Sequence, residues 1–166
     1  MNTRPILSIP MTILEKVIKV LSVSLIVIMF LTIFYHWIAL PNKVPIHFNA
    51  SGNVDGWGSR GSLWILPMIG LILFVMMSIL ERFPHIYNYP VMITEKNAPK
   101  LYLEARRMLV ILGFEMLLLF SYISWGTVQA AFGKTLISMW TIPIFLIVIF
   151  CTIGISLYRL FETDKK

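Results

Sequence analysis

The chain has 166 residues, of which 58% are hydrophobic and only 13% are charged. A soluble domain of this length could not bury so much apolar surface, so the composition predicts an integral membrane protein. The net charge of +6 comes from basic clusters beside apolar segments, which favours membrane lipid as partner and argues against direct nucleic-acid binding. A single cysteine, Cys151, excludes an intrachain disulfide.

Four segments of the chain are almost free of charged residues. Three have no Asp, Glu, Lys or Arg (20–42, 61–80 and 135–158), and the fourth, 108–133, has only Glu115. A helix of about 20 residues crosses the hydrocarbon core, where every backbone polar group must be paired internally. We therefore predict one all-α membrane domain with four transmembrane helices, at about 13–40, 63–81, 98–131 and 137–160.

The first predicted helix begins before its apolar segment. Thr12 and Glu15 have the spacing of a capping box, in which the hydroxyl and the carboxylate each accept a backbone N–H left free by the first turn. The apolar segment that follows is longer than the roughly 7–15 residues of a signal-peptide core. We interpret it as a permanent membrane anchor.

The loop predicted at 41–62 is rich in residues with strong backbone preferences. Pro41 and Pro45 favour an extended backbone over Leu40–Ile46. Gly, Asn and Asp residues then favour tight turns over Asn49–Gly58. This loop is longer than a connection needs to be, and we expect it to be ordered.

The same loop carries a resemblance to a family of membrane proteins. The residues that carry it are Leu40, Pro41, Val44, Pro45, His47, Phe48, Gly52, Asp55, Gly56, Trp57, Ser59 and Arg60. Their pattern resembles the loop of small bacterial membrane proteins that include the SdpI-type immunity proteins. The resemblance implies the bacterial cytoplasmic membrane, self-protection against a secreted toxic peptide, and signalling inward.

Five side chains of this loop are predicted to bind a ligand: His47, Phe48, Asp55, Trp57 and Arg60. Phe48 and Trp57 flank the polar turn and could hold the loop against the headgroup surface. His47 and Asp55 would then face each other, or a ligand, across the turn. A purely structural role, in which His47 and Asp55 bind the loop's own backbone, is the alternative.

His47 and Asp55 also allow two chemical interpretations. With His36 they are side chains of the kind that bind zinc, although their spacing matches no metal motif, so we predict no metal and no cofactor. With Ser51 or Ser59 as nucleophile they would make a membrane hydrolase. No oriented third group is evident, and no catalytic residue is predicted.

Glu115 is the second candidate site. It lies about 12 Å beyond Arg107 along the predicted helix, at 1.5 Å per residue. Tyr122 and Gln129 follow at intervals of seven and share its helix face. An ionisable group at this depth should face the bundle interior, with hydroxyls at comparable depth as partners: Thr152, Ser156 or Ser78. Glu115 either fixes helix packing as a hydrogen-bonded glutamate or serves a proton or ion relay.

The basic residues predict the orientation. Eleven of the fourteen Lys and Arg residues lie in the two termini and the second loop, and only Lys43, Arg60 and Lys134 lie in the other loops. The positive-inside rule then places both termini and the loop 82–97 in the cytoplasm, with the loop 41–62 outside. The basic segment 82–107 is expected to be a solvated, lipid-attracted flank or a docking site for a cytoplasmic regulator.

Three functions follow from these sites. The first is a non-enzymatic membrane protein whose outer loop recognises an extracytoplasmic ligand, such as a secreted peptide toxin. The second is a small transporter or channel subunit that uses the Glu115 face and oligomerises to enclose a path. The third is a hydrolase that uses His47 and Asp55.

Overall fold

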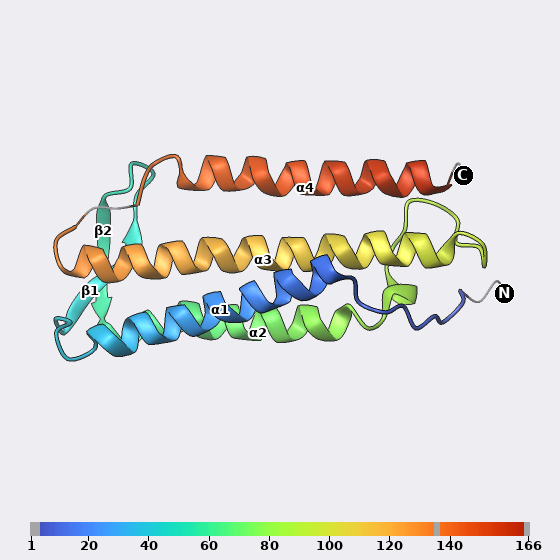
Figure 1. Cartoon of the computed structure of the whole chain (residues 1–166). Coiled ribbons are helices and arrows are strands. Elements are labelled where there is room, and N and C mark those ends of the chain that lie inside the picture. The colour runs from blue at the N-terminus through green and yellow to red at the C-terminus, as the bar shows by residue number, and fades with distance from the viewer. Residues whose placement is uncertain (1–3, 135–136, 165–166) are drawn as a thin grey trace.

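The computed structural model describes residues 4–134 and 137–164, so the predicted basic residues Lys165 and Lys166 lie outside it. Four long helices run side by side (Figure 1): α1 (Ile13–His36), α2 (Ile65–Leu80), α3 (Ala98–Ala131) and α4 (Thr141–Asp164). Among the described residues, four helices are long and apolar enough to cross a membrane, the second counted from Arg60. This confirms the four predicted long apolar helices and fits a multi-pass membrane protein.

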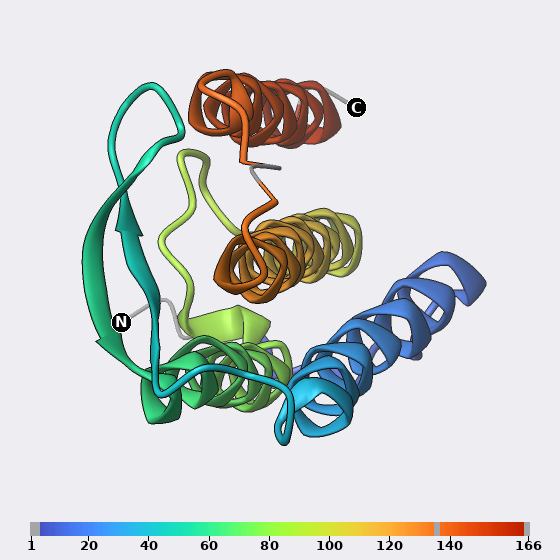
Figure 2. The ribbon, with the colours of Figure 1, turned by 90° about the vertical axis from the view of Figure 1, so that its left-hand side faces the viewer.

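Helix α3 is the centre of the bundle, because α1, α2 and α4 all pack against it (Figure 2). Midway along the bundle, Ile26 and Met29 of α1 pack with Leu117 of α3. Nearer the hairpin, a second cluster contains one residue from each of five segments: Ile33, Leu40, Val44, Leu63 and Val128. Most apolar side chains of α4 point away from the protein, as expected for a helix surrounded by lipid.

Helix α1 begins at the predicted residue but ends earlier than predicted. The capping box of Thr12 and Glu15 is present as predicted and opens α1. Helix α1 ends at His36 and closes with a turn in which Leu40 N donates to His36 O at 3.0 Å, because the residue before Pro41 is driven out of the helical region. A short 3₁₀ helix, η1 (Arg60–Trp64), precedes α2.

The loop between α1 and α2 is a β-hairpin, so the all-α prediction is wrong at this point. Strand β1 (Lys43–Phe48) pairs antiparallel with β2 (Val54–Ser59), and the turn is confined to 49–53. Gly56 therefore lies in a strand and not in the turn. A Cβ atom at Gly56 would lie 2.8 Å from the Cβ of His47, so this glycine lets the two strands approach.

The hairpin crosses one end of the bundle, running from the α1–α2 pair past α3 toward the start of α4 (Figure 2). Its turn meets the connection between α3 and α4. Gly52, at φ +81°, lies so close to this connection that a Cβ atom would be 2.2 Å from the carbonyl oxygen of Ile137. The hairpin thus lies across the same end of all four helices.

We expect Gly52→Ala to detach the hairpin turn. An L-residue at this φ costs about 1–2 kcal/mol, and the contact with Ile137 adds to that cost. Gly133→Ala is the matched control, since Gly133 has φ +80° and no described atom lies within 4 Å of its Cβ position. Limited proteolysis should cleave the hairpin faster in Gly52→Ala than in Gly133→Ala. Equal cleavage rates would show that the turn does not rest on Ile137.

The opposite end of the bundle is closed by buried ion pairs. The guanidinium of Arg106 contacts the carboxylate of Glu15 at 2.8 Å, and the two side chains are 8% and 0% exposed. Lys19 Nζ lies 2.5 Å from Glu81 Oε2, and Glu81 is 7% exposed. The prediction of a solvated flank over 82–107 is therefore wrong for Arg106, and neighbouring Glu81 is buried as well.

The amino-terminal segment is part of this closure. Arg106 Nη1 donates to Ile9 O at 2.7 Å and Nη2 to Pro10 O at 2.9 Å. Tyr102 Oη donates to Pro5 O at 3.1 Å, and Arg4 Nη1 donates to Tyr87 O at 2.5 Å. Side chains of α3 thus donate to backbone carbonyls of the amino-terminal segment, and Arg4 donates to a carbonyl of the α2–α3 connection. These bonds hold residues 4–12 against both elements.

The α2–α3 connection is ordered by tyrosines. Tyr87 Oη donates to Leu80 O and Tyr89 Oη donates to Pro84 O, each at 2.9 Å. Burial, together with the negative charge of Glu81, raises the pKa of Tyr87 to about 12. Tyr87 therefore stays a protonated donor across the physiological range, and its bond to the end of α2 does not depend on pH there.

Candidate functional site

The hairpin presents a histidine–aspartate pair on its exposed face. His47 Nδ1 and Asp55 Oδ1 are 2.5 Å apart, and the two side chains are 70% and 43% exposed. When Nδ1–H donates to the carboxylate, the imidazole is held in one tautomer and its Nε2 is left to accept a hydrogen bond. Trp57 lies two residues beyond Asp55 on β2, so both side chains project from the same face, and Trp57 is 58% exposed.

A side-chain cap fixes the turn between the two strands. Asn49 Oδ1 accepts from the backbone N–H groups of Ser51 and Asn53, both at 3.0 Å. Asn49 N also donates to Asn53 O at 2.8 Å. Asparagine is favoured in turns because its side chain pairs with the backbone a few residues on, so this loop is ordered by its own sequence.

Arg60 and Phe48, which were predicted to face a ligand, have different surroundings. The guanidinium of Arg60 lies 4.9 Å from the ring centroid of Trp37, and its Nη1 donates to Trp37 O at 3.5 Å. Arg60 therefore joins the base of the hairpin to the end of α1. Phe48 is half-buried and pairs with Val54 next to the turn. His47, Asp55 and Trp57 remain as the exposed group.

The other side chains considered for chemistry at the hairpin lie apart from this group. His36 Nδ1 pairs with Thr32 O at 2.8 Å, and its ring packs against Phe132. Within 4–134 and 137–164, no three His, Cys, Asp or Glu side chains gather into a cluster. In that same part of the chain, the hydrogen-bond partner of His47 is Asp55, and neither Ser51 nor Ser59 bonds to the histidine.

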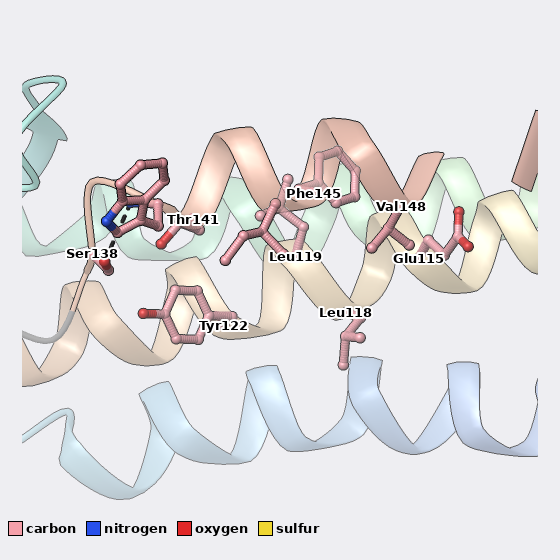
Figure 3. A pocket seen from close by; sticks show the side chains of 10 residues that line it. Glu115, Leu118, Leu119, Tyr122, Ser138, Thr141, Phe145 and Val148 are labelled. Carbon is pink, nitrogen blue, oxygen red and sulfur yellow. Dashed lines mark hydrogen bonds between the residues drawn. The ribbon is translucent and has the colours of Figure 1, made fainter. Parts of the chain in front are cut away.

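Glu115 lies inside the bundle, at one end of a cavity of about 440 Å³ between α3 and α4. The hydroxyl of Thr152 donates to Glu115 Oε1 at 2.6 Å, which selects Thr152 from the three predicted partners. Oε2 of the same carboxylate is buried and has no hydrogen bond to any described residue. Figure 3 shows Tyr122, Ser138 and Thr141 at the other end of the cavity, with apolar side chains between. Gln129, predicted to share this site, does not line the cavity.

Two comparisons define the family. Residues 24–71 match a domain of unknown function (DUF1648). The chain is also 31% identical over 153 residues to an uncharacterized protein of Archaeoglobus fulgidus, across 85% of this chain and 82% of that protein. The chain carries a DUF1648 domain and belongs to the family of this archaeal protein.

No solved structure matches the chain. The DUF1648 domain takes in the second half of α1, the whole hairpin, η1 and the first turns of α2. The exposed group of His47, Asp55 and Trp57 lies inside it, whereas Glu115 and the buried pair of Glu15 and Arg106 lie outside. The hairpin therefore lies in the middle of the matched domain, between its two helical parts.

Proposed function

We propose that this protein lies in a cytoplasmic membrane with both termini inside, and that its hairpin recognises an extracytoplasmic ligand without catalysing a reaction. The observation that carries the proposal is the exposed group of His47, Asp55 and Trp57 on an ordered hairpin. A hairpin held by a capped turn and by the Arg60–Trp37 contact is preorganised, so a ligand need not bear the cost of ordering it.

The ligand that fits this group best is a peptide. Imidazole Nε2 and the carboxylate of Asp55 can pair with backbone or side-chain N–H groups, and an exposed indole offers a large apolar contact. The loop's resemblance to SdpI-type immunity proteins supports a protective role against a secreted peptide. The loop 82–97 would then face the cytoplasm, where a regulator could read the state of the protein.

The orientation predicts which end of the protein a membrane-impermeant thiol reagent reaches. In a Cys151→Ala background, Ser51→Cys in the hairpin turn should be labelled in intact cells. Lys96→Cys, at an exposed position at the opposite end, should be labelled only after lysis. The reverse pattern would overturn both the orientation and the role proposed for the hairpin.

Substitutions in the exposed group should remove protection without preventing insertion. Cells that lack the protein, challenged with the peptide fraction of spent medium from the producing species, should survive when wild-type protein is supplied. His47→Ala, Asp55→Ala and Trp57→Ala should each reduce survival to the level of the empty strain at unchanged membrane abundance. Lys96→Ala is the control at the other end. Full protection by all three hairpin variants would refute the proposal.

A second candidate function rests on Glu115. A carboxylate with one unpaired oxygen, beside a cavity between two membrane-crossing helices, is the arrangement from which ion and proton pathways are built. In this alternative the chain is a subunit of an oligomeric transporter or channel. Uptake of a radioactive cation or of protons into vesicles, abolished by Glu115→Gln, would favour it over recognition at the hairpin.

A further inference from the structure

A small charged cavity lies between α3 and α4 at the end of the bundle where α3 begins and α4 ends, opposite the hairpin (Figure 1). Its volume is about 200 Å³, less than the roughly 300–1,000 Å³ of sites that enclose a whole small molecule. Among the described residues, only charged and hydroxyl side chains line it: Lys100, Glu104, Arg159, Glu162 and Thr163. A cavity of this size and lining fits the polar end of a larger ligand.

The position of the cavity along the helices corresponds to the lipid headgroups of a membrane. The hydrocarbon core is about 30 Å thick, whereas the 34 residues of α3 extend for about 51 Å at 1.5 Å per residue. Every lysine and arginine of α3 lies in 98–107, and the charged residues of α4 begin at Arg159. Charged side chains are costly in hydrocarbon, so these parts of the two helices belong at the level of the headgroups.

The two walls of the cavity are held together by apolar packing. Leu160 of α4 is only 3% exposed and packs with Leu101 and Ala105 of α3. Tyr87 and Tyr89 of the α2–α3 connection pack against the same cluster. The charged side chains beside this cluster therefore project from fixed helices, and a ligand does not bear the cost of bringing the two walls together.

The charges that line the cavity are incompletely paired with one another. Glu104 Oε1 accepts from Arg107 Nη1 at 2.7 Å, one turn further into α3. Arg159 Nη1 lies 3.9 Å from Glu104 Oε2, and the side chain of Arg159 is 53% exposed. Lys100 is exposed and forms no ion pair with any residue of 4–134 or 137–164. Both Lys100 and Arg159 can therefore donate hydrogen bonds to an anionic group in the cavity.

We propose that this cavity binds the headgroup of one zwitterionic phospholipid, in which Lys100 and Arg159 donate to the phosphate and Glu162 accepts from the ammonium. Two cations and two carboxylates line the cavity, so a ligand with both signs of charge finds a partner for each. A ligand with negative charge alone would place that charge beside the carboxylates, which is unfavourable.

Phosphatidylethanolamine is the phospholipid that fits this lining best. Its phosphate accepts hydrogen bonds from the two basic side chains, and its ammonium has three N–H donors for a carboxylate. Phosphatidylcholine has the same charges but no N–H donor, and phosphatidylglycerol has the phosphate without a cation. These three lipids therefore separate hydrogen bonding at the ammonium from charge alone.

The test uses the purified full chain, delipidated in detergent, with bound lipids counted by native mass spectrometry. The three dioleoyl lipids have identical acyl chains, so only their headgroups differ. One phosphatidylethanolamine should bind per chain, about three- to tenfold more tightly than phosphatidylcholine or phosphatidylglycerol. Inorganic phosphate at millimolar concentration should not displace it, because the acyl chains contribute to the binding of the lipid.

Substitutions in the lining should change lipid binding according to the part of the headgroup that each residue contacts. Lys100→Ala and Arg159→Ala should each weaken the binding of phosphatidylethanolamine about three- to tenfold. Glu162→Gln should reduce the preference for ethanolamine over choline and leave the affinity for phosphatidylcholine unchanged. Lys96→Ala is the matched control, because it removes an exposed charge at the same end but outside the cavity. All four side chains are exposed, so these variants should fold as the wild type does.

Four results would overturn the inference. Equal affinities for the three lipids would show that the headgroup does not contribute to binding. Tighter binding of phosphatidylglycerol would assign the cavity to an anionic lipid, and displacement by inorganic phosphate would assign it to a soluble anion. A preference for phosphatidylethanolamine that persists in both Lys100→Ala and Arg159→Ala would place the lipid elsewhere on the protein.

Discussion

Arg106→Ala should lower the free energy of unfolding by about 3–5 kcal/mol, the cost of leaving a buried charge without its partner. Glu15 would keep its bonds from Thr12 but lose the guanidinium, at a position that is 0% exposed. The carbonyls of Ile9 and Pro10 would also lose their donors, so the amino-terminal segment should detach. Thermal unfolding in detergent, followed by tryptophan fluorescence, measures the loss.

Two further variants test whether the loss of stability comes from the ion pair. Lys100→Ala, at an exposed basic position of the same helix, should change stability by no more than about 0.5 kcal/mol. Glu15→Leu combined with Arg106→Met should cost less than the sum of the two single changes, because no charge is left unpaired. If Arg106→Ala were as stable as Lys100→Ala, the pair would contribute nothing and Arg106 would be a solvated flank residue.

Glu115→Lys should destabilise the protein by about 2.5–3.5 kcal/mol, the cost of a lysine at the centre of a membrane span. Its ammonium would meet the apolar cavity between α3 and α4, too far from either end to reach water easily. Glu115→Gln should stay within about 1 kcal/mol of wild type, because the amide oxygen can still accept from Thr152. Unfolding midpoints of the purified variants give the comparison.

Thr152→Val measures the contribution of the hydrogen bond while leaving the carboxylate of Glu115 in place. It should cost about 1–3 kcal/mol, since Glu115 Oε1 loses its donor while the side-chain volume hardly changes. A Glu115→Gln variant that unfolds as easily as Glu115→Lys would show that the carboxylate charge is needed for folding. One that folds normally yet loses function would instead support the transporter alternative.

Features that depend on residues close together in the sequence could be predicted from the sequence. The four helices that are long and apolar enough to cross a membrane follow from apolar segments of sufficient length, because lipid leaves no other structure for such segments. The capping box depends on two residues three positions apart. The loop at 41–62 was predicted to be ordered, but its turn residues did not indicate that Gly56 and Trp57 would pair as a strand with β1.

Features that depend on distant contacts were decided only by the tertiary structure. Arg106 stands among other basic residues in the sequence, and only the packing of α3 on α1 brings it to Glu15, which lies 91 positions away. Similarly, a cavity under the hairpin exists because β1, α2 and α3 meet there, so no single one of these segments predicts it. Periodicity shows which residues share a helix face, whereas the neighbouring element determines what that face meets.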